Sequence, residues 1–145
     1  MADTSPIAGG RAPTNGNSYN PIVGPTAYPV GTPVCENAAG RTIPALASSL
    51  GTATPTGVAT APGVPGQRSM TQFAGPMSLT IAEWAAITGE VIGLTPGAVY
   101  FVSTATAGRL TKIPPTGDGN LSSQVGIAVS NTDLNVQLSA SQPAG

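Results

Sequence analysis

Residues 125–138, VGIAVSNTDLNVQL, carry the clearest fold signal in this sequence. Large apolar residues occupy every second position of 125–129, and the same alternation returns in 134–138 against polar neighbours. A period of two places every second side chain on one face of a β-strand. The stretch therefore predicts an antiparallel β-hairpin with its turn at residues 130–133.

Working towards the N-terminus, a second apolar strand is predicted over 99–104. Residues 95–98, TPGA, place proline and glycine at the two centres of a type II turn that leads into this strand. Both faces of the strand are apolar, which is typical of a strand packed between two layers. A turn at 107–108 then leads to a shorter strand over 109–113, and 114–120 is expected to be a loop.

One helix is predicted, over residues 80–89. Thr80 and Glu83 fit a capping box, and Gly89 fits the residue that ends a helix. The apolar residues 81, 84 and 87 recur at i, i+3 and i+6, so we expect this helix to place its tryptophan on the core.

The first half of the chain is richer in turn residues. Residues 1–69 hold 10 of the 15 prolines, and prolines confine strands to sheet edges or to first positions. Short β-prone pieces are still present between turn signals at 37–40 and 61–66. The expected strands are 30–36, 41–46, 56–61 and, interrupted near Gly75 and Pro76, 69–79.

These patterns predict an all-β fold, a small β-sandwich or jelly-roll-like domain with one short helix. We assign residues 1–28 to an extended Pro/Gly-rich arm, 29–139 to the β-sandwich domain and 140–145 to a C-terminal tail. The arm shows neither helical nor strand periodicity, and a disordered tail is the alternative reading of its composition.

Composition excludes several kinds of chemistry. The 145 residues include no histidine and one cysteine, Cys35, which rules out a histidine-based catalytic triad, an internal disulfide and a thiolate zinc cluster. Five basic and six acidic residues give a net charge of −1, so nothing favours nucleic acid or an anionic membrane as partner. We expect no enzyme activity, no metal and no cofactor, and we expect Cys35 to be a buried apolar residue.

The sequence also lacks a secretory signal pattern and any apolar run of membrane-spanning length, so synthesis in a cytoplasm is expected. Charged residues make up only 8% of the chain, which is low for a monomer that must stay soluble. This low charge predicts that much of the surface contacts other protein.

Two acidic features of the sequence are candidate sites. Glu83 and Glu90 could form the carboxylate pair of a small hydrolase, although Glu83 already fits the capping box. Asp118 in the loop TGDGN could bind calcium, but the loop lacks the spacing and the bidentate glutamate of a known calcium site. An ordinary glycine-rich turn is the preferred interpretation.

The scattered arginines and the apolar residues of the arm are the candidates for contact with other proteins. An isolated arginine in a chain so poor in charge can make a directional ion pair or carbonyl contact at an interface. Apolar anchors in an arm can fill pockets on a neighbour. The candidate contact residues are Ile7, Arg11, Tyr19, Ile22, Tyr28, Arg41 and Arg68.

Four segments carry a resemblance when taken in order: SLTIAEWAAITG at 78–89, GLTPGAVYFVST at 93–104, GRLTKIPPT at 108–116, and the hairpin at 125–138. Together they resemble tailed-phage capsid decoration, or cement, proteins and related β domains of head fibres and tail appendages. The match spans about residues 70–138, and residues 1–28 have no counterpart in it.

The resemblance implies a structural protein on the outside of an icosahedral phage shell. Such a protein would bridge neighbouring major capsid proteins, stabilise the head against internal DNA pressure, and pair with itself as a dimer or trimer. It would be found in the virion, and in the host cytoplasm during assembly. An alternative is a head-fibre or tail-fibre domain that binds a host glycan through Trp84, Tyr100 or Phe101, although core packing also accounts for these three residues.

Overall fold

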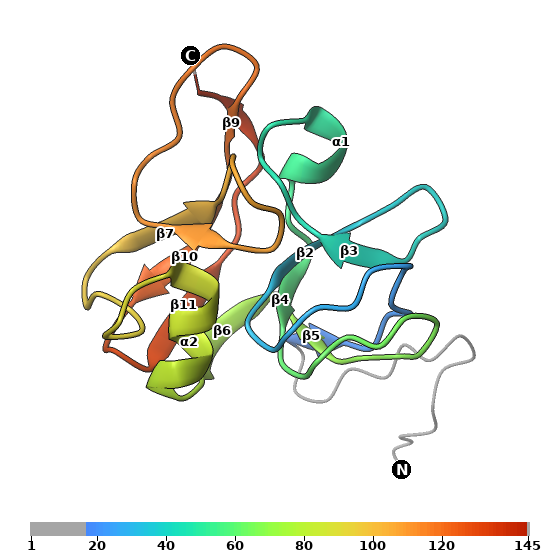
Figure 1. The fold of residues 1–145 in the computed structure, drawn as a ribbon, viewed down its shortest axis with the longest axis horizontal. Coiled ribbons are helices and arrows are strands. Elements are labelled where there is room, and N and C mark those ends of the chain that lie inside the picture. Colours follow the sequence, from blue (N-terminus) through green and yellow to red (C-terminus); the bar gives the residue numbers. More distant parts are fainter. Residues whose placement is uncertain (1–16, 145) are drawn as a thin grey trace.

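The computed structural model describes residues 17–144 and shows an all-β sandwich with two short helices (Figure 1). The predicted all-β fold is confirmed. Its first sheet is antiparallel, five-stranded and ordered β1-β5-β4-β2-β3. The strands of this sheet are β1 (Ser18–Tyr19), β2 (Pro33–Glu36), β3 (Thr42–Pro44), β4 (Gly57–Ala59) and β5 (Thr71–Gln72).

The second sheet is also antiparallel and five-stranded, in the order β6-β11-β10-β7-β8, and a two-stranded ladder of β9 and β12 lies near the C-terminus. Each large sheet comes from one contiguous half of the chain, so consecutive strands do not interleave between sheets as in a jelly roll. The remaining strands are β6 (Ala74–Ser78), β7 (Val99–Val102), β8 (Leu110–Thr111), β9 (Leu121–Ser122), β10 (Gln124–Ala128), β11 (Asp133–Gln137) and β12 (Gln142–Pro143).

A single stretch of chain connects the two sheets, because β5 and β6 are separated only by Phe73. The predicted bend near Gly75 and Pro76 lies here. Gly75 has a left-handed φ of 86°, and the side-chain amide of Gln72 donates to the carbonyls of residues 74, 75 and 76. Pro76 stands on an edge strand of the second sheet, where a missing N–H does not break a ladder.

Residues 17–28 are part of the first sheet, which corrects the predicted arm over this stretch. Ile22 bridges Arg68 on one side, and the next residue, Val23, bridges Thr42 of β3 on the other. The segment thereby joins the two margins of the first sheet into a closed ring of backbone hydrogen bonds. The prolines in this segment fit extended backbone, but burial of its apolar residues holds it against the sheet. Residues 1–16 lie outside the described residues.

Closure gives the first half a small core of its own, made of Val23, Tyr28, Val34 and Ala59. The main core lies on the other face of this sheet and is shared with the second half. Its members from the first half include Cys35 and Val58, the sequence neighbours of Val34 and Ala59. Alternation along β2 and β4 thus gives the first sheet two apolar faces.

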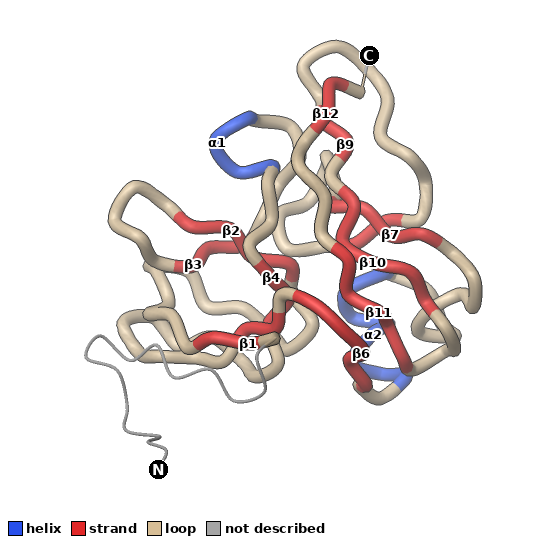
Figure 2. The backbone as a smooth tube through the Cα atoms, turned by 180° about the vertical axis from the view of Figure 1, so that it is seen from behind, coloured by secondary structure: helices blue, strands red, loops and turns tan. Residues whose placement is uncertain are grey.

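Helix α2 (Ile81–Thr88) covers one face of the second sheet (Figures 1 and 2). The predicted capping box and the left-handed Gly89 that ends the helix are both present. Trp84 is fully buried and its Nε1 donates to the carbonyl of Thr132 at 2.7 Å. Ile81 departs from the expected apolar face, because it is about half exposed at the first turn.

A second helix, α1 (Leu50–Ala53), was not predicted. It is one turn long and its Leu50 is largely exposed, so it has no amphipathic period that a sequence pattern could reveal. No helix in residues 17–144 is long and apolar enough to span a membrane.

The hairpin of β10 and β11 forms as predicted, with Gly126 opposite Val136 and Ala128 opposite Leu134. Alternation holds on β11 but is interrupted on β10, where the register with β7 shifts between Gln124 and Gly126. A β-bulge of this kind turns the following side chains to the other face. Ala128 therefore faces the core, and Val129 is exposed.

Candidate functional site

Four of the seven predicted contact residues line one surface cleft of about 330 Å³ in the first half: Tyr19, Ile22, Arg41 and Arg68. The residues that complete its lining are Pro21, Glu36, Ala39 and Gly40. Segments far apart in the sequence meet here, because the chain closure at Ile22 places residues 19–22 between Arg68 and the β2–β3 turn.

The β2–β3 turn holds Arg41 at the cleft. Asn37 and Arg41 are paired through their backbones, with a 2.9 Å bond from the amide of Asn37 to the carbonyl of Arg41. The Asn37 side chain accepts from the amides of Ala39 and Arg41, and Gly40 supplies the left-handed residue with φ of 75°. This is an ordinary asparagine-led turn, and the sequence predicted it at 37–40.

The polar groups of the cleft differ in how well they are paired. The Tyr19 hydroxyl is placed 3.2 Å from Oε2 of Glu36 and 3.1 Å from Oγ1 of Thr56, and it donates toward both. Arg68 donates from Nη1 to the carbonyl of Asn20 at 3.1 Å. Within residues 17–144 the one ion pair is that of Lys112 and Glu90, so neither Arg41 nor Arg68 has a carboxylate partner there. The cleft presents two exposed guanidinium groups.

The other predicted contact residues do not join this cleft. Tyr28 belongs to the small core of the first half and not to this cleft, since it is only 4% exposed and its hydroxyl shares a 2.8 Å hydrogen bond with Thr42. Burial raises the pKa of Tyr28 and outweighs the lowering effect of that hydrogen bond. Ile7 and Arg11 lie outside the described residues.

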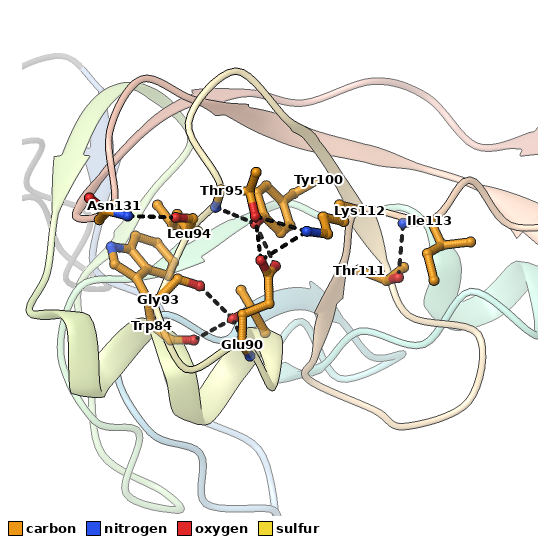
Figure 3. A network of polar contacts seen from close by, with 11 residues as sticks. Trp84, Glu90, Gly93, Leu94, Thr95, Tyr100, Thr111, Lys112, Ile113 and Asn131 are labelled. Atoms are coloured by element: carbon orange, nitrogen blue, oxygen red, sulfur yellow. Dashed lines mark hydrogen bonds and ion pairs between the residues drawn. The ribbon is translucent and has the colours of Figure 1, made fainter.

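The second half contains a polar network around Glu90 (Figure 3). Oε2 of Glu90 accepts from the Tyr100 hydroxyl at 2.6 Å, and Oε1 accepts from the Thr95 hydroxyl. Lys112 completes the network with its Nζ 3.2 Å from Oε1 of Glu90 and 2.9 Å from Oγ1 of Thr95. Every carboxylate oxygen is therefore engaged.

These contacts shift the ionisation of both partners. Partial burial acts to raise the pKa of Glu90, but hydrogen bonds from Thr95, Tyr100 and Lys112, with the charge of Lys112, outweigh it and hold the pKa below its ordinary value. Burial, with donation to Glu90, raises the pKa of Tyr100. A carboxylate held ionised by three donors is a poor proton acceptor near neutral pH, so this arrangement favours fixing loop 90–95 to β7 and to Lys112, the residue that follows β8.

The other acidic candidates have local roles or none. Glu83 closes the capping box of α2 by accepting from the amide of Thr80 at 3.0 Å. Asp118 is exposed in its loop, and residues 17–144 contain no group of three His, Cys, Asp or Glu side chains that could hold a metal ion.

Three of the four remaining candidates, Trp84, Tyr100 and Cys35, belong to the main core. Trp84 and Tyr100 are fully buried, in agreement with the interpretation that they pack in the core, and Phe101 is half-buried. Cys35 is buried as expected, and burial, with a smaller contribution from the charge of Glu36, raises the pKa of its thiol to about 11. Cys35 therefore stays protonated at neutral pH.

Sequence patterns did not single out Glu36. It stands at the end of a predicted strand beside a predicted turn, and only the fold brings it to the same cleft as Arg68. No protein-family model matches the chain, and the comparison with curated proteins finds no match.

Proposed function

We propose that this protein is a structural, non-enzymatic capsid decoration protein that attaches to the outside of a phage head and bridges neighbouring major capsid proteins. The observation that carries the proposal is the cleft, where two exposed arginines that have no carboxylate partner within residues 17–144 lie beside Tyr19 and Ile22. Arginine is enriched at protein interfaces because its planar guanidinium makes paired, directional hydrogen bonds. The low charge of the whole chain and the resemblance of residues 70–138 support the same function.

Weak contacts suffice in such a role. A shell displays the same binding surface many times, so a protein that engages two neighbouring copies gains effective concentration from the lattice. A dimer or trimer on a symmetry axis would multiply this gain.

The direct test is to purify heads of the phage that encodes this chain and to analyse them by mass spectrometry and cryo-electron microscopy. We expect the protein to co-sediment with DNA-filled heads and to appear as density on the outer surface. Absence from purified heads, or density confined to the tail, would contradict decoration. Density at a fibre tip would instead favour the host-binding alternative.

A truncation tests the role of the N-terminal residues. Because residues 17–28 close the first sheet, a deletion must stop at residue 16 to leave the described fold intact. We expect the Δ1–16 variant to fold and to bind heads more weakly. Equal attachment of the truncated and full chains would exclude a clamping role for residues 1–16.

A further inference from the structure

We infer that the cleft is a receptor for a single carboxylate, carried by an aspartate or glutamate side chain of a partner protein. Two guanidinium groups and one carboxylate, that of Glu36, give the cleft a net charge of +1. Glu36 forms no ion pair with either arginine and instead accepts from Tyr19. The positive charge is therefore uncompensated within residues 17–144, and one monoanion would neutralise it.

The charge balance favours a carboxylate over a phosphate. Arginine pairs with both anions through parallel N–H···O bonds. A phosphate group at pH 7 carries about 1.5 to 2 negative charges, so it would leave an excess negative charge beside Glu36. A carboxylate matches the cleft without that repulsion.

The walls of the cleft favour a peptide over a sugar. Sugar sites commonly offer an exposed aromatic ring, whereas Tyr19 is only 7% exposed and its ring packs near Phe73, with centroids 6.2 Å apart. Pro21 and Ile22 supply an apolar wall for the methylene groups of an acidic side chain. At about 330 Å³ the cleft is at the small end of ligand sites, which suits one side chain with its adjoining backbone.

The identity of the partner as a capsid protein rests on the proposed function, but the chemistry of the cleft does not. A solution experiment on the isolated full-length protein therefore tests the inference alone. We would follow the Nε–H signals of the arginines by NMR while adding acetyl-aspartate amide, with acetyl-asparagine amide as the neutral probe. We expect saturable shifts at Arg41 and Arg68 with the acidic probe, and none at Arg109, an exposed arginine outside the cleft.

Substitution gives the quantitative test. The double variant R41Q/R68Q is expected to bind acetyl-aspartate amide at least about 10-fold more weakly, because it removes both charged hydrogen-bond donors of the cleft. R109Q is the matched control and should bind as the wild type does. Amide spectra of all variants would verify that the fold is unchanged.

Several results would overturn the inference. Equal shifts at all three arginines, or equal responses to the acidic and neutral probes, would show that the cleft is no carboxylate site. Tighter binding of inorganic phosphate, or of glucuronate, would assign the cleft to a phosphate or to an acidic glycan instead. If the probe binds as expected but the protein is absent from purified heads, the carboxylate site stands and the proposed function fails.

Discussion

Both halves of the molecule contain a tyrosine–glutamate pair, but the two pairs differ in whether the neighbouring basic side chains are paired with a carboxylate. In each, a tyrosine hydroxyl donates to a glutamate: Tyr19 to Glu36 in the first half, and Tyr100 to Glu90 in the second. In the second half Lys112 completes the arrangement, and the pair becomes a closed network. In the first half the nearby Arg41 and Arg68 have no carboxylate partner within the described residues, and their charges are not neutralised there.

This difference shows why residue type alone does not identify a binding site. Glu90 and Lys112 have the residue types of an acid–base site, yet their contacts satisfy each other and tie a loop to two strands. Arg41 and Arg68 stand alone in the sequence, yet closure of the first sheet brings both to one cleft. The distinguishing property is whether the charges are compensated within the fold.

The largest loss of stability is expected in the second half, when its largest buried side chain, Trp84, is removed. Trp84→Ala is expected to lower the free energy of unfolding by about 3–5 kcal/mol, since it leaves a cavity and removes the bond to Thr132. Thermal and urea unfolding would measure the loss. Trp84→Phe should cost less because most of the apolar volume remains, and equal losses for both variants would contradict a packing role.

The next effect is expected at the β-bulge. A Cβ atom on Gly126 would lie 2.4 Å from the carbonyl oxygen of Asn135, so Gly126→Ala should cost about 1–3 kcal/mol through displaced backbone. Gly51→Ala in α1 is the matched control from the first half. Gly51 has open space around its Cβ position and no left-handed φ, so this change should be neutral or stabilise by about 0.4–1 kcal/mol. If both changes destabilise the protein by a similar amount, the loss at Gly126 does not come from the contact between its Cβ position and the Asn135 carbonyl.

Removing the charge of Glu90 tests the difference between the two tyrosine–glutamate pairs directly. Glu90→Gln is expected to cost about 1–2 kcal/mol at neutral pH, because three donors lose a charged acceptor. Glu36→Gln should cost less, since Glu36 is exposed and, within the described part of the chain, its carboxylate accepts from Tyr19 alone. If the losses are equal, the two tyrosine–glutamate pairs do not differ as we describe.

The network also predicts a pH dependence. Folding lowers the pKa of Glu90, so its ionised form is favoured in the folded state. The resulting stability is fully present above about pH 4.3, the ordinary pKa of glutamate, and is lost as the pH falls from there through the lower folded value. Unfolding curves between pH 7 and pH 3 should therefore converge for wild type and E90Q. A constant difference across this range would contradict the assignment.

The smallest effect on stability is expected at the cleft. R41Q and R68Q should each change the free energy of unfolding by less than about 0.5 kcal/mol, because both side chains are exposed and neither has an ion pair in the described chain. Loss of stability comparable to that of E90Q would mean that the arginines are structural and not available to a partner.

Local patterns predicted the elements better than their assembly. The capping box, the type II turn at 95–98, the hairpin and the turn at 37–40 were all visible, because each depends on residues within one short segment. The bulge on β10 was not, since it arises from register against β7. Closure of the first sheet by residues 22–24 was missed for the same reason: it pairs positions distant in the chain.

The candidate site shows the same limit. Residue type and isolation in the sequence made Tyr19, Ile22, Arg41 and Arg68 candidates one by one, and their role as contacts stays a prediction. Their common location, the contribution of Glu36 and the burial of Tyr28 depend on long-range pairing. An apolar anchor in an extended segment can equally fill the core of its own domain, as Tyr28 does.

Closure of the first sheet bears on how strand margins are protected in a chain with so few charges. Exposed strand margins are templates for pairing with another chain, and proteins protect them with charged side chains, prolines, bulges or a covering segment. Here Ile22 and Gly24 form backbone hydrogen bonds with Thr42 of β3. In the second half, Pro76 has no N–H to offer on the edge strand β6, and the Gln72 side-chain amide donates to the Pro76 carbonyl. At these two margins, backbone and side-chain hydrogen bonds and a proline, not charges, reduce the number of groups with which a strand of another chain could pair.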